Sequence, residues 1–342
     1  MIALSSVAQR LPMPVTFRVA RLVGAGWYLA APRRRSLARA NLLRVCRYLV
    51  EAGMARPGVA AASRDPRALE RLLRSAFQHF ALYYLEVLLL PRYTATYVLD
   101  HLAIDDPALV EALMGENGPG HHAIFVAMHF GALEIPSLYI TQVRGIPIVA
   151  PMETLDNAPL QDALLRARAR TAITILPLRG SGPALAAAFA AGSSIGLVAD
   201  RDIRHSGTVV DFFGHPAPLP TGPAIFAVES GAALMVVAAR RTRPGEYAGA
   251  VIPIEMPGTG SRRERVRLTV QAMAHAMERL VAAAPEQWWT IFFPVWPDLR
   301  MAAGTTAPAA RDAFDAPTAR GTHAAPDGEE PTSGSGTADV RQ

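Results

Sequence analysis

Two apolar runs of this chain end on side chains that could carry acid–base chemistry. Residues 123–128 are followed by His129 and, five positions later, by Glu134, and residues 195–199 are followed by Asp200. Ligands of open α/β sheets bind outside the carboxyl ends of the strands, so polar residues at strand ends are the first candidates for a site. A histidine there could remove a proton from an alcohol while a nearby carboxylate fixes its tautomer and stabilises the imidazolium.

The spacing of His129 and Glu134 limits how they could meet. Residues five apart in one continuous helix point about 140° apart, so the two share a face only if His129 lies outside the helix. Gly131 between them allows such a turn. Asp200 is the other candidate partner, and the spacing leaves open which carboxylate touches the imidazole. A structural histidine and a capping or loop aspartate are the alternatives.

The pattern around these residues predicts an α/β fold. From about residue 121, short apolar runs of strand type alternate with alanine-rich helical stretches, as in βαβ units. We therefore expect a central, mostly parallel sheet flanked by helices. The predicted strands are residues 123–128, 146–150, 173–176, 195–199, 209–213, 234–239 and 250–254, and the predicted helices are residues 132–143, 158–170, 183–191, 222–230 and 263–284.

The segment before this domain has a helical pattern. The second half of the run 66–90 is apolar nearly all round and must be buried in protein or lipid. Residues 11–30 are apolar but contain two prolines and two arginines, so we expect neither a transmembrane helix nor a cleaved signal. With Trp27, Tyr28 and the arginines at 33–35, this segment is typical either of a helix in a bilayer interface or of one packed on the domain.

Composition sets wider limits. The 51% hydrophobic content supports a large core, and a net charge of +5, with arginine as the basic residue at all 34 positions, favours anionic partners. The single cysteine, Cys46, excludes an internal disulfide framework. We expect three parts: a helical, membrane-associating region at residues 1–100, an α/β core at 101–300, and a disordered, dispensable tail at 301–342, which is rich in Ala, Pro, Thr, Gly and Ser.

Several blocks of sequence follow a common pattern. They are A-M-H-F-G-A-L-E around His129, L-P-L-R-G at 176–180, V-A-D-R-D at 198–202 and V-D-F-F-G-H-P-A-P-L-P-T-G-P-A at 210–224, with R-S-A-F, L-P-R, P-E-Q-W-W and P-V-W-P elsewhere. Together they resemble the bacterial lipid A late acyltransferases and the phosphatidylinositol mannoside acyltransferases of the lysophospholipid acyltransferase superfamily. The resemblance covers roughly residues 11–298 and implies a glycerolipid acyltransferase-like fold.

The resemblance also implies an activity. It is the transfer of a fatty acyl group from acyl-CoA or acyl-carrier protein to a hydroxyl of a phosphatidylinositol mannoside-like or lipid A-like glycolipid, without a cofactor or metal. His129 would be the general base, with Glu134 or Asp200 as its acidic partner. Ala132 and Leu133 stand where family members often carry Asn and Trp, so we expect acceptor recognition to differ. The expected location is the cytoplasmic face of the inner membrane, peripheral or monotopic.

Other residues are assigned to substrate binding. Arg168 matches a family arginine that faces the acyl donor or the acceptor's phosphate, although Arg166 and Arg170 are close enough to replace it in the match. The Pro-rich block is expected to form a rigid loop before a helix whose amino end suits an anion, or else a turn that closes the sheet. The remaining candidates for substrate binding are Arg201, Phe213, Gly214, Pro220 and Gly222.

Two other classes of function compete with acyl transfer. Ser194 lies in a G-x-S-x-G match, which suggests a serine esterase or lipase. A nucleophile elbow follows a strand and opens a helix, whereas this match follows a helical stretch and opens a strand. A non-catalytic, basic protein that binds nucleic acid or a membrane is the second alternative, but the arginines are scattered and no nucleic-acid recognition motif accompanies them. His121 and His122 precede a strand and have no zinc-type spacing with other ligands.

Overall fold

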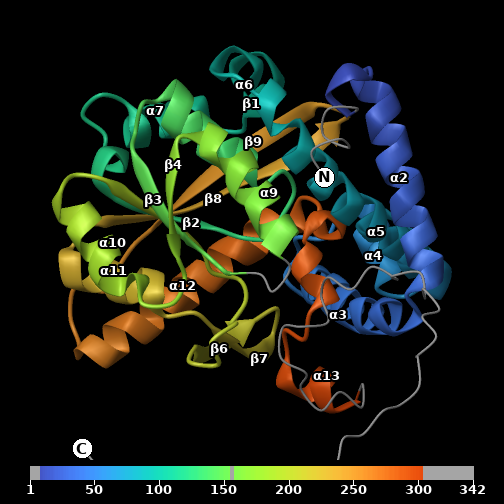
Figure 1. The fold of residues 1–342 in the computed structure, drawn as a ribbon. Helices are drawn as coiled ribbons and strands as arrows, with labels where there is room; N and C mark the ends of the chain where they lie inside the picture. Colours follow the sequence, from blue (N-terminus) through green and yellow to red (C-terminus); the bar gives the residue numbers. More distant parts are fainter. Residues whose placement is uncertain (1–7, 155–157, 303–342) are drawn as a thin grey trace, which may run out of the picture. The chain divides into compact units, whose positions relative to one another are not determined.

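The computed structural model describes residues 8–154 and 158–302. Its centre is a seven-stranded sheet in the order β1-β9-β8-β2-β5-β3-β4 (Figure 1). The strands are β1 (Leu102–Ile104), β2 (Ala123–Ala127), β3 (Ile148–Met152), β4 (Ile173–Pro177), β5 (Ser194–Val198), β8 (Ala233–Arg243) and β9 (Glu246–Ile254). Neighbouring strands are parallel except for the β8–β9 pair, so the predicted α/β class with a mostly parallel sheet is confirmed.

Six predicted strands lie in this sheet with shifted ends. The largest extension is at β8 and β9, because the two continue past their neighbours as an antiparallel hairpin that closes at Arg243 and Glu246. Strand β1 is absent from the prediction. It has three residues at the sheet edge, which is too short for an alternating pattern to appear.

The Pro-rich block forms a strand, which corrects the expectation of a rigid loop. Strand β7 (His215–Leu219) pairs antiparallel with β6 (Thr208–Phe212) in a separate two-stranded sheet. Pro216 and Pro218 are tolerated because both strands of such a sheet are edges, where a missing backbone N–H costs little.

Phe213 and Gly214 make the turn of this hairpin. Their φ angles are 51° and 72°, the positive values that a two-residue type I′ hairpin turn requires at both positions. Helix α11 (Gly222–Ser230) then begins and ends where the sequence predicts.

Helices cover both faces of the sheet. Around the strands lie α6 (Ala95–His101), α7 (Pro107–Met114), α8 (Glu134–Leu138), a π-helical turn (Tyr139–Val143), α9 (Ala158–Arg168), α10 (Ser181–Ala190), α11 and α12 (Arg262–Ala282). Helix α13 (Pro297–Ala302) instead contacts the helix Pro32–Glu51. Ile124 and Val126 of β2 pack in one apolar cluster that includes Met273 of α12, while Phe125 packs in a second cluster with Val110 of α7. Alternate side chains of β2 are therefore buried on opposite faces.

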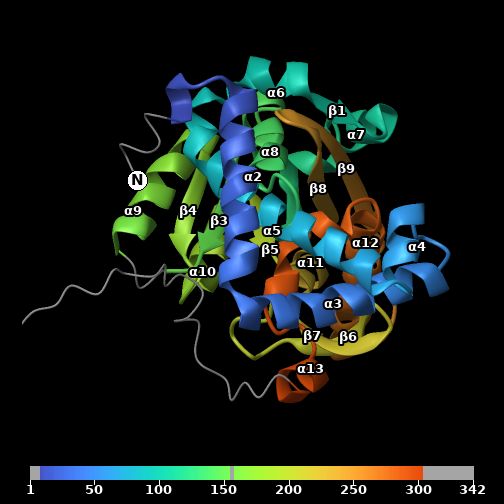
Figure 2. The same cartoon turned by 90° about the vertical axis from the view of Figure 1, so that its right-hand side faces the viewer.

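The described helices between Met13 and Leu89 are α2 (Met13–Ala30), α3 (Pro32–Glu51), α4 (Pro57–Ala62) and α5 (Pro66–Leu89). Helix α5 is buried along its second half, as its apolar pattern predicts. Helix α2 packs on α5 (Figure 2). Trp27 is half-buried in an aromatic cluster with Phe77, Phe80 and Phe292, and Tyr28 is buried, so both side chains pack on the domain.

The outer face of α2 is nevertheless apolar. Val15, Val19, Leu22, Val23 and Leu29 are exposed, with Leu22 and Leu29 each 72% accessible. The helix therefore packs on the domain with one face and presents an apolar stripe with the other. None of the helices that the structure describes is both long and apolar enough to span a bilayer.

The predicted tail, residues 301–342, lies almost entirely outside the described residues. Met301 and Ala302 form the end of α13, and the rest of the predicted tail, residues 303–342, lies outside the described residues. At the other end, α3 contacts the segment Trp289–Phe292, and α5 contacts Pro285–Gln287. These contacts join the N-terminal helices to the sheet domain in one compact unit.

Candidate active site

The turn after β2 places His129 outside any helix. Strand β2 ends at Ala127 and α8 begins only at Glu134. Gly131 has a φ of +53°, and a Cβ on it would overlap the carbonyl oxygen of Ala239. The Ala132 N–H donates to that same oxygen at 2.9 Å. The predicted glycine turn is therefore present, and it brings the chain too close to β8 for any other residue type.

Asp200 is the carboxylate that contacts His129. The Nδ1 atom of His129 lies 2.7 Å from Asp200 Oδ1, and the backbone N–H of His129 donates to Asp200 Oδ2 at 3.0 Å. Strands β2 and β5 are adjacent and parallel with Ala127 opposite Val198, so both residues lie two positions past a matched pair. The sheet register thus brings together two residues that are 71 positions apart.

Asp200 is buried and fully hydrogen bonded. Its Oδ2 also accepts from Trp288 Nε1 at 2.9 Å and from Thr290 Oγ1 at 2.5 Å. Burial alone raises the pKa of this carboxyl, but the charge interaction with His129 and the hydrogen bonds from His129, Thr290 and Trp288 outweigh it, and the pKa falls to about 2. Asp200 is therefore ionised at neutral pH and accepts the Nδ1 proton of His129, which leaves Nε2 as the basic atom.

Glu134 points to a different partner. Its Oε1 accepts from Arg168 Nε at 2.9 Å and from Arg168 Nη2 at 2.8 Å, and Arg168 Nη2 also reaches the Tyr83 hydroxyl at 3.3 Å. Burial lowers the pKa of the Arg168 guanidinium, but the interactions with Glu134 and Tyr83 raise it above its ordinary value, so Arg168 keeps its positive charge. The ring of Tyr83 lies 4.6 Å from that of Trp289 between centres, and the Trp289 ring centre is in turn 4.4 Å from that of His129. The pair thus supports one wall of the site.

The two tryptophans of the P-E-Q-W-W block each contact one member of the His129–Asp200 pair. The backbone N–H of Trp289 donates to the His129 carbonyl oxygen at 3.0 Å, and Trp288 forms an isolated β-bridge with Phe130. Thr290 completes the set through Asp200. Sequence reasoning included this block in the family resemblance without giving its residues a role. No spacing rule could have found them, because they reach the site from the far end of the chain.

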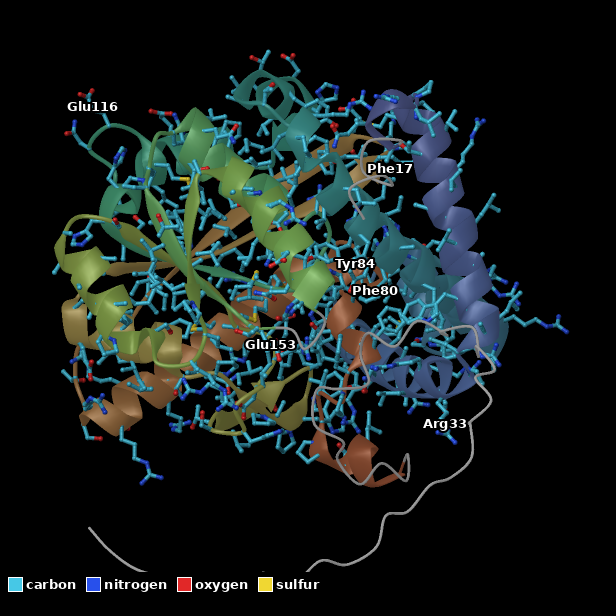
Figure 3. The ribbon with its side chains drawn as sticks, in the orientation of Figure 1. Phe17, Arg33, Phe80, Tyr84, Glu116 and Glu153 are labelled. Atoms are coloured by element: carbon cyan, nitrogen blue, oxygen red, sulfur yellow. The ribbon has the colours of Figure 1, made fainter. Side chains whose placement is uncertain are left out.

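Arg168 is one of three arginines that the sequence placed here. Arg166 is exposed on α9 and the side chain of Arg170 is outside the description, whereas Arg168 contacts Glu134. Arg201 also lies at the site, because it follows Asp200 and its guanidinium carbon is 3.6 Å from the ring centre of Phe293. Figure 3 shows the side chains of Phe80 and Tyr84 together in this region, with Glu153 below them.

The residues of the Pro-rich block lie away from His129. Phe213 is fully buried, its N–H donates to Glu278 Oε1 at 2.5 Å, and its ring contacts Trp288 at 5.3 Å between centres. Phe213 therefore backs the tryptophan that holds Asp200. Gly214 is exposed in the hairpin turn, Pro220 is half-buried after β7, and Gly222 is exposed at the start of α11. Substrate binding by these four residues stays a prediction.

Ser194 has the wrong surroundings for a nucleophile. It is buried at the first position of β5, where its hydroxyl accepts from Ala123 N–H at 3.1 Å and donates to the Gly120 carbonyl at 3.1 Å. A strand entrance is the reverse of a nucleophile elbow. Within residues 8–154 and 158–302, no three His, Cys, Asp or Glu side chains are grouped so that they could hold a metal ion.

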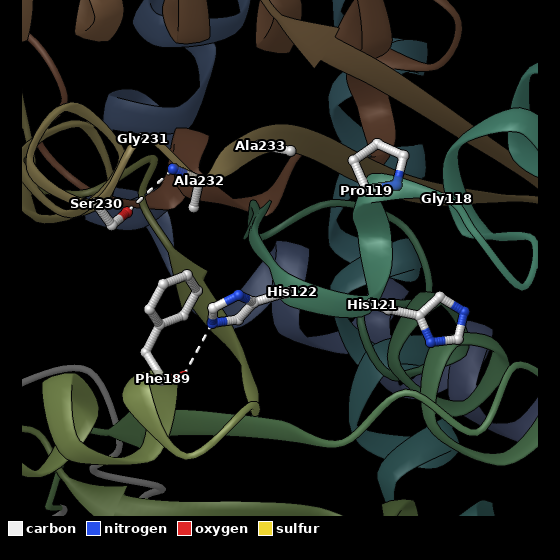
Figure 4. Close-up of a pocket in the computed structure, with 9 residues that line it drawn as sticks. All are labelled: Gly118, Pro119, His121, His122, Phe189, Ser230, Gly231, Ala232 and Ala233. Carbon is white, nitrogen blue, oxygen red and sulfur yellow. Dashed lines mark hydrogen bonds between the residues drawn. The ribbon is translucent and has the colours of Figure 1, made fainter.

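A cavity of about 360 Å³ lies at the opposite end of β2 (Figure 4). It is lined by Gly118, Pro119, His121, His122, Phe189, Ser230, Gly231, Ala232 and Ala233. His122 stacks on the Phe189 ring at 3.8 Å, and its Nε2 lies 2.9 Å from the Phe189 carbonyl oxygen. These lining residues include no carboxylate to pair with a histidine, so acid–base chemistry belongs to the His129 end.

Comparison with known proteins identifies the family of this chain. The family described as bacterial lipid A biosynthesis acyltransferase matches residues 2–296, which is most of the chain. The chain belongs to this family. Its members are acyltransferases, so the enzyme class that the sequence blocks imply is confirmed.

Individual relatives are similar over shorter stretches. A phosphatidylinositol mannoside acyltransferase of Mycolicibacterium smegmatis is 28% identical over 222 residues, which cover 62% of this chain and 72% of that protein. A protein of the same name from Mycobacterium tuberculosis is 29% identical over 194 residues. That match spans 56% of each chain, little more than half of the relative's length.

Proposed function

We propose that the chain transfers a fatty acyl group from an acyl thioester to a hydroxyl of a membrane glycolipid, with His129 as the general base. The observation that carries the proposal is the pair of His129 and Asp200 at the carboxyl end of β2, with Nδ1 bonded to the ionised carboxylate at 2.7 Å. The side chain of His129 is 15% exposed, so its free Nε2 is within reach of a substrate that enters the site.

The chemistry follows from this pair. Nε2 takes the proton of the acceptor hydroxyl while the hydroxyl oxygen attacks the thioester carbonyl carbon, and Asp200 stabilises the imidazolium that forms. The carbon–sulfur bond then breaks, the ester remains on the glycolipid, and the imidazolium returns the proton to the leaving thiolate. No enzyme nucleophile takes part, and the reaction as proposed needs no resident cofactor or metal.

The proposed acceptor is a phosphatidylinositol mannoside-like glycolipid rather than a lipid A-like one. Support comes from the names of the two mycobacterial relatives. Acyl-CoA and acyl-carrier protein both satisfy the chemistry of the donor. In this scheme Glu134 and Arg168 shape the site beside Trp289 and do not relay the proton, because their side chains contact each other, Tyr83 and Met152.

We further propose peripheral attachment to the cytoplasmic face of the inner membrane through the outer face of α2. The exposed apolar stripe of that helix is accompanied by the exposed Arg18 and Arg21, which suits an anionic bilayer surface. Val23→Glu should weaken co-flotation with anionic vesicles, because it places a charge in the stripe. Val209→Glu is the matched control, since Val23 and Val209 are both 61% exposed and Val209 lies on β6. Equal flotation of both variants would exclude α2 as the attachment site.

Transfer itself is tested with purified full-length chain and radiolabelled palmitoyl-CoA. One set of vesicles contains phosphatidylinositol mannoside and a second contains a lipid A-type acceptor. We expect labelled acylated mannoside, and lipid mass spectrometry of cells with and without the gene should show the same species missing. Release of free fatty acid without any acylated lipid, and loss of that release in Ser194→Ala, would replace acyl transfer by serine hydrolysis.

A further inference from the structure

Two arginines meet one aromatic ring beside the dyad. The guanidinium carbon of Arg201 lies 3.6 Å from the ring centre of Phe293, and that of Arg34 lies 5.5 Å from the same centre. Arg201 comes from the loop after β5, where it directly follows Asp200, and Arg34 comes from the first turn of α3. Segments far apart in sequence thus bring two positive charges to one place next to the catalytic pair.

The charge of Arg201 has no bonded counterion. Within the described residues, it forms no ion pair and donates no hydrogen bond, although it is half-buried. Burial lowers its pKa, the charges of Asp200 and Glu153 raise it, and the charge of Arg34 lowers it again. Asp200 already has its hydrogen bonds to His129, Trp288 and Thr290, so Glu153 is the carboxylate left in the vicinity.

Arg34 is held in position by the backbone. Its Nη1 donates to the Phe292 carbonyl oxygen at 2.9 Å, next to the ring that both guanidiniums approach. Two cations sharing one ring repel each other, and an anion bound between them would relieve that repulsion. A guanidinium matches the oxygens of a phosphate with two parallel N–H bonds, so phosphate is the anion that this arrangement suits best.

The position of Arg34 indicates which phosphate. Helix α2 ends at Ala30 with Leu29 exposed, and α3 begins two residues later, so Arg34 follows the apolar stripe directly. A lipid whose chains lie against that stripe would bring its phosphodiester to the start of α3, where Arg34 lies. The phosphates of a CoA donor have the same chemistry, but nothing ties them to the lipid side of the site.

We propose that Arg34 and Arg201 form a phosphate site that binds the phosphodiester of the acceptor lipid. This inference rests on the proposed function and names how that site recognises its acceptor. The ring of Phe293 contacts both guanidiniums and so helps to fix their positions.

The test compares the effect of each substitution on the KM for the acceptor lipid with its effect on the KM for the acyl donor. Arg201→Gln and Arg34→Gln, as full-length proteins, are assayed with palmitoyl-CoA and with vesicles containing phosphatidylinositol mannoside. We expect the KM for the vesicle acceptor to rise about 10-fold or more in each, because a charge-assisted hydrogen bond is lost, while the KM for palmitoyl-CoA stays within about 2-fold. Arg201→Lys and Arg34→Lys should recover part of the loss, since they keep the charge.

Arg33→Gln is the matched control. It removes the same charge from the neighbouring residue, which is exposed on the outer side of α3 (Figure 3), and should change the acceptor KM by less than about 2-fold. Equal effects of Arg33→Gln and Arg34→Gln would show general attraction to the vesicle and overturn the site. A rise in the palmitoyl-CoA KM alone would overturn the assignment to the acceptor and give the site to the donor. Unchanged constants with full transfer activity would reject the site but keep the proposed function.

Discussion

The two ends of strand β2 each carry a histidine, and the two imidazole rings differ in the group that their nitrogen faces. His122 directly precedes the strand, and its ring nitrogen faces the neutral carbonyl oxygen of Phe189 at 2.9 Å. His129 follows the strand, and its ring nitrogen faces the carboxylate of Asp200 at 2.7 Å. Both rings lie against an aromatic side chain. A carbonyl oxygen orients an imidazole, whereas a carboxylate also stabilises its positive charge.

The difference follows from the direction of the strands. At the carboxyl end, parallel β2 and β5 bring the loops of two strands to one edge, so a residue after each can meet. At the amino end, Ser194 of β5 also contacts β2, but its hydroxyl only accepts from the Ala123 N–H and donates to the Gly120 carbonyl. One end of the sheet thus assembles reactive groups, and the other holds the chain together.

Replacing each histidine gives the largest contrast. His129→Ala should lower kcat for acyl transfer by about 100-fold to 10,000-fold, because general-base catalysis contributes on that scale. His122→Ala should change kcat by less than about 3-fold. Initial rates with labelled palmitoyl-CoA measure both. Comparable losses in the two variants would remove the distinction between the two ends of the strand.

Asp200→Asn tests the carboxylate that separates the two sites. The amide keeps the shape but can hold the wrong imidazole tautomer, so kcat should fall by about 100-fold. Thr290→Val removes one hydrogen bond to Asp200 and should cost far less. If Asp200→Asn retained activity close to that of the unaltered protein, the orienting role of Asp200 would be wrong.

Glu134→Gln is expected to act on stability more than on catalysis. It leaves the buried guanidinium of Arg168 without its carboxylate, which should lower the free energy of unfolding by about 3 kcal/mol. The loss in kcat should be smaller than in Asp200→Asn. Urea unfolding and initial rates of both variants measure the two effects. The opposite ranking of kcat would return the partner role to Glu134.

Low pH should reduce the free energy of unfolding, because Asp200 becomes protonated. Its pKa is lowered from 3.8 to about 2 on folding, so its contribution is fully present above pH 3.8 and is lost as the pH falls through 2. That contribution is about 2 kcal/mol. The difference in unfolding free energy between the unaltered protein and Asp200→Asn should therefore shrink from pH 5 toward pH 2. A difference that stays constant over this range would show that the carboxyl is not ionised in the folded protein.

Ser194→Ala should have the smallest effect on activity. It leaves the buried N–H of Ala123 without its acceptor, which costs about 1 to 3 kcal/mol of stability. Transfer rates should stay within about 2-fold of the unaltered protein, because the serine lies at the amino end of the sheet. Near-complete loss of activity with an unchanged melting temperature would revive the serine hydrolase alternative.

Much of the fold follows from local sequence. Apolar runs of four to six residues separated by alanine-rich stretches predict strands and helices, because burial on both faces of a parallel sheet needs continuous apolar residues. Helix α11 begins at Gly222 as its proline predicts. Gly131 marks the turn that frees His129 from α8. Strand β7 was missed because proline argues against a strand unless the strand is an edge, and edges are set by the partners of a strand.

The sequence also determined that His129 has a carboxylate within reach, but only the tertiary structure decided which one. Glu134 is only five positions away along the chain, but the turn at Gly131 separates the two residues and the Glu134 carboxylate binds Arg168 instead. Asp200 is 71 positions away, yet the pairing of β2 with β5 places it against the imidazole. Strand order and register depend on contacts between distant segments, and local patterns of residues do not specify them. The same holds for Trp288 and Thr290, which reach Asp200 from near the end of the described chain.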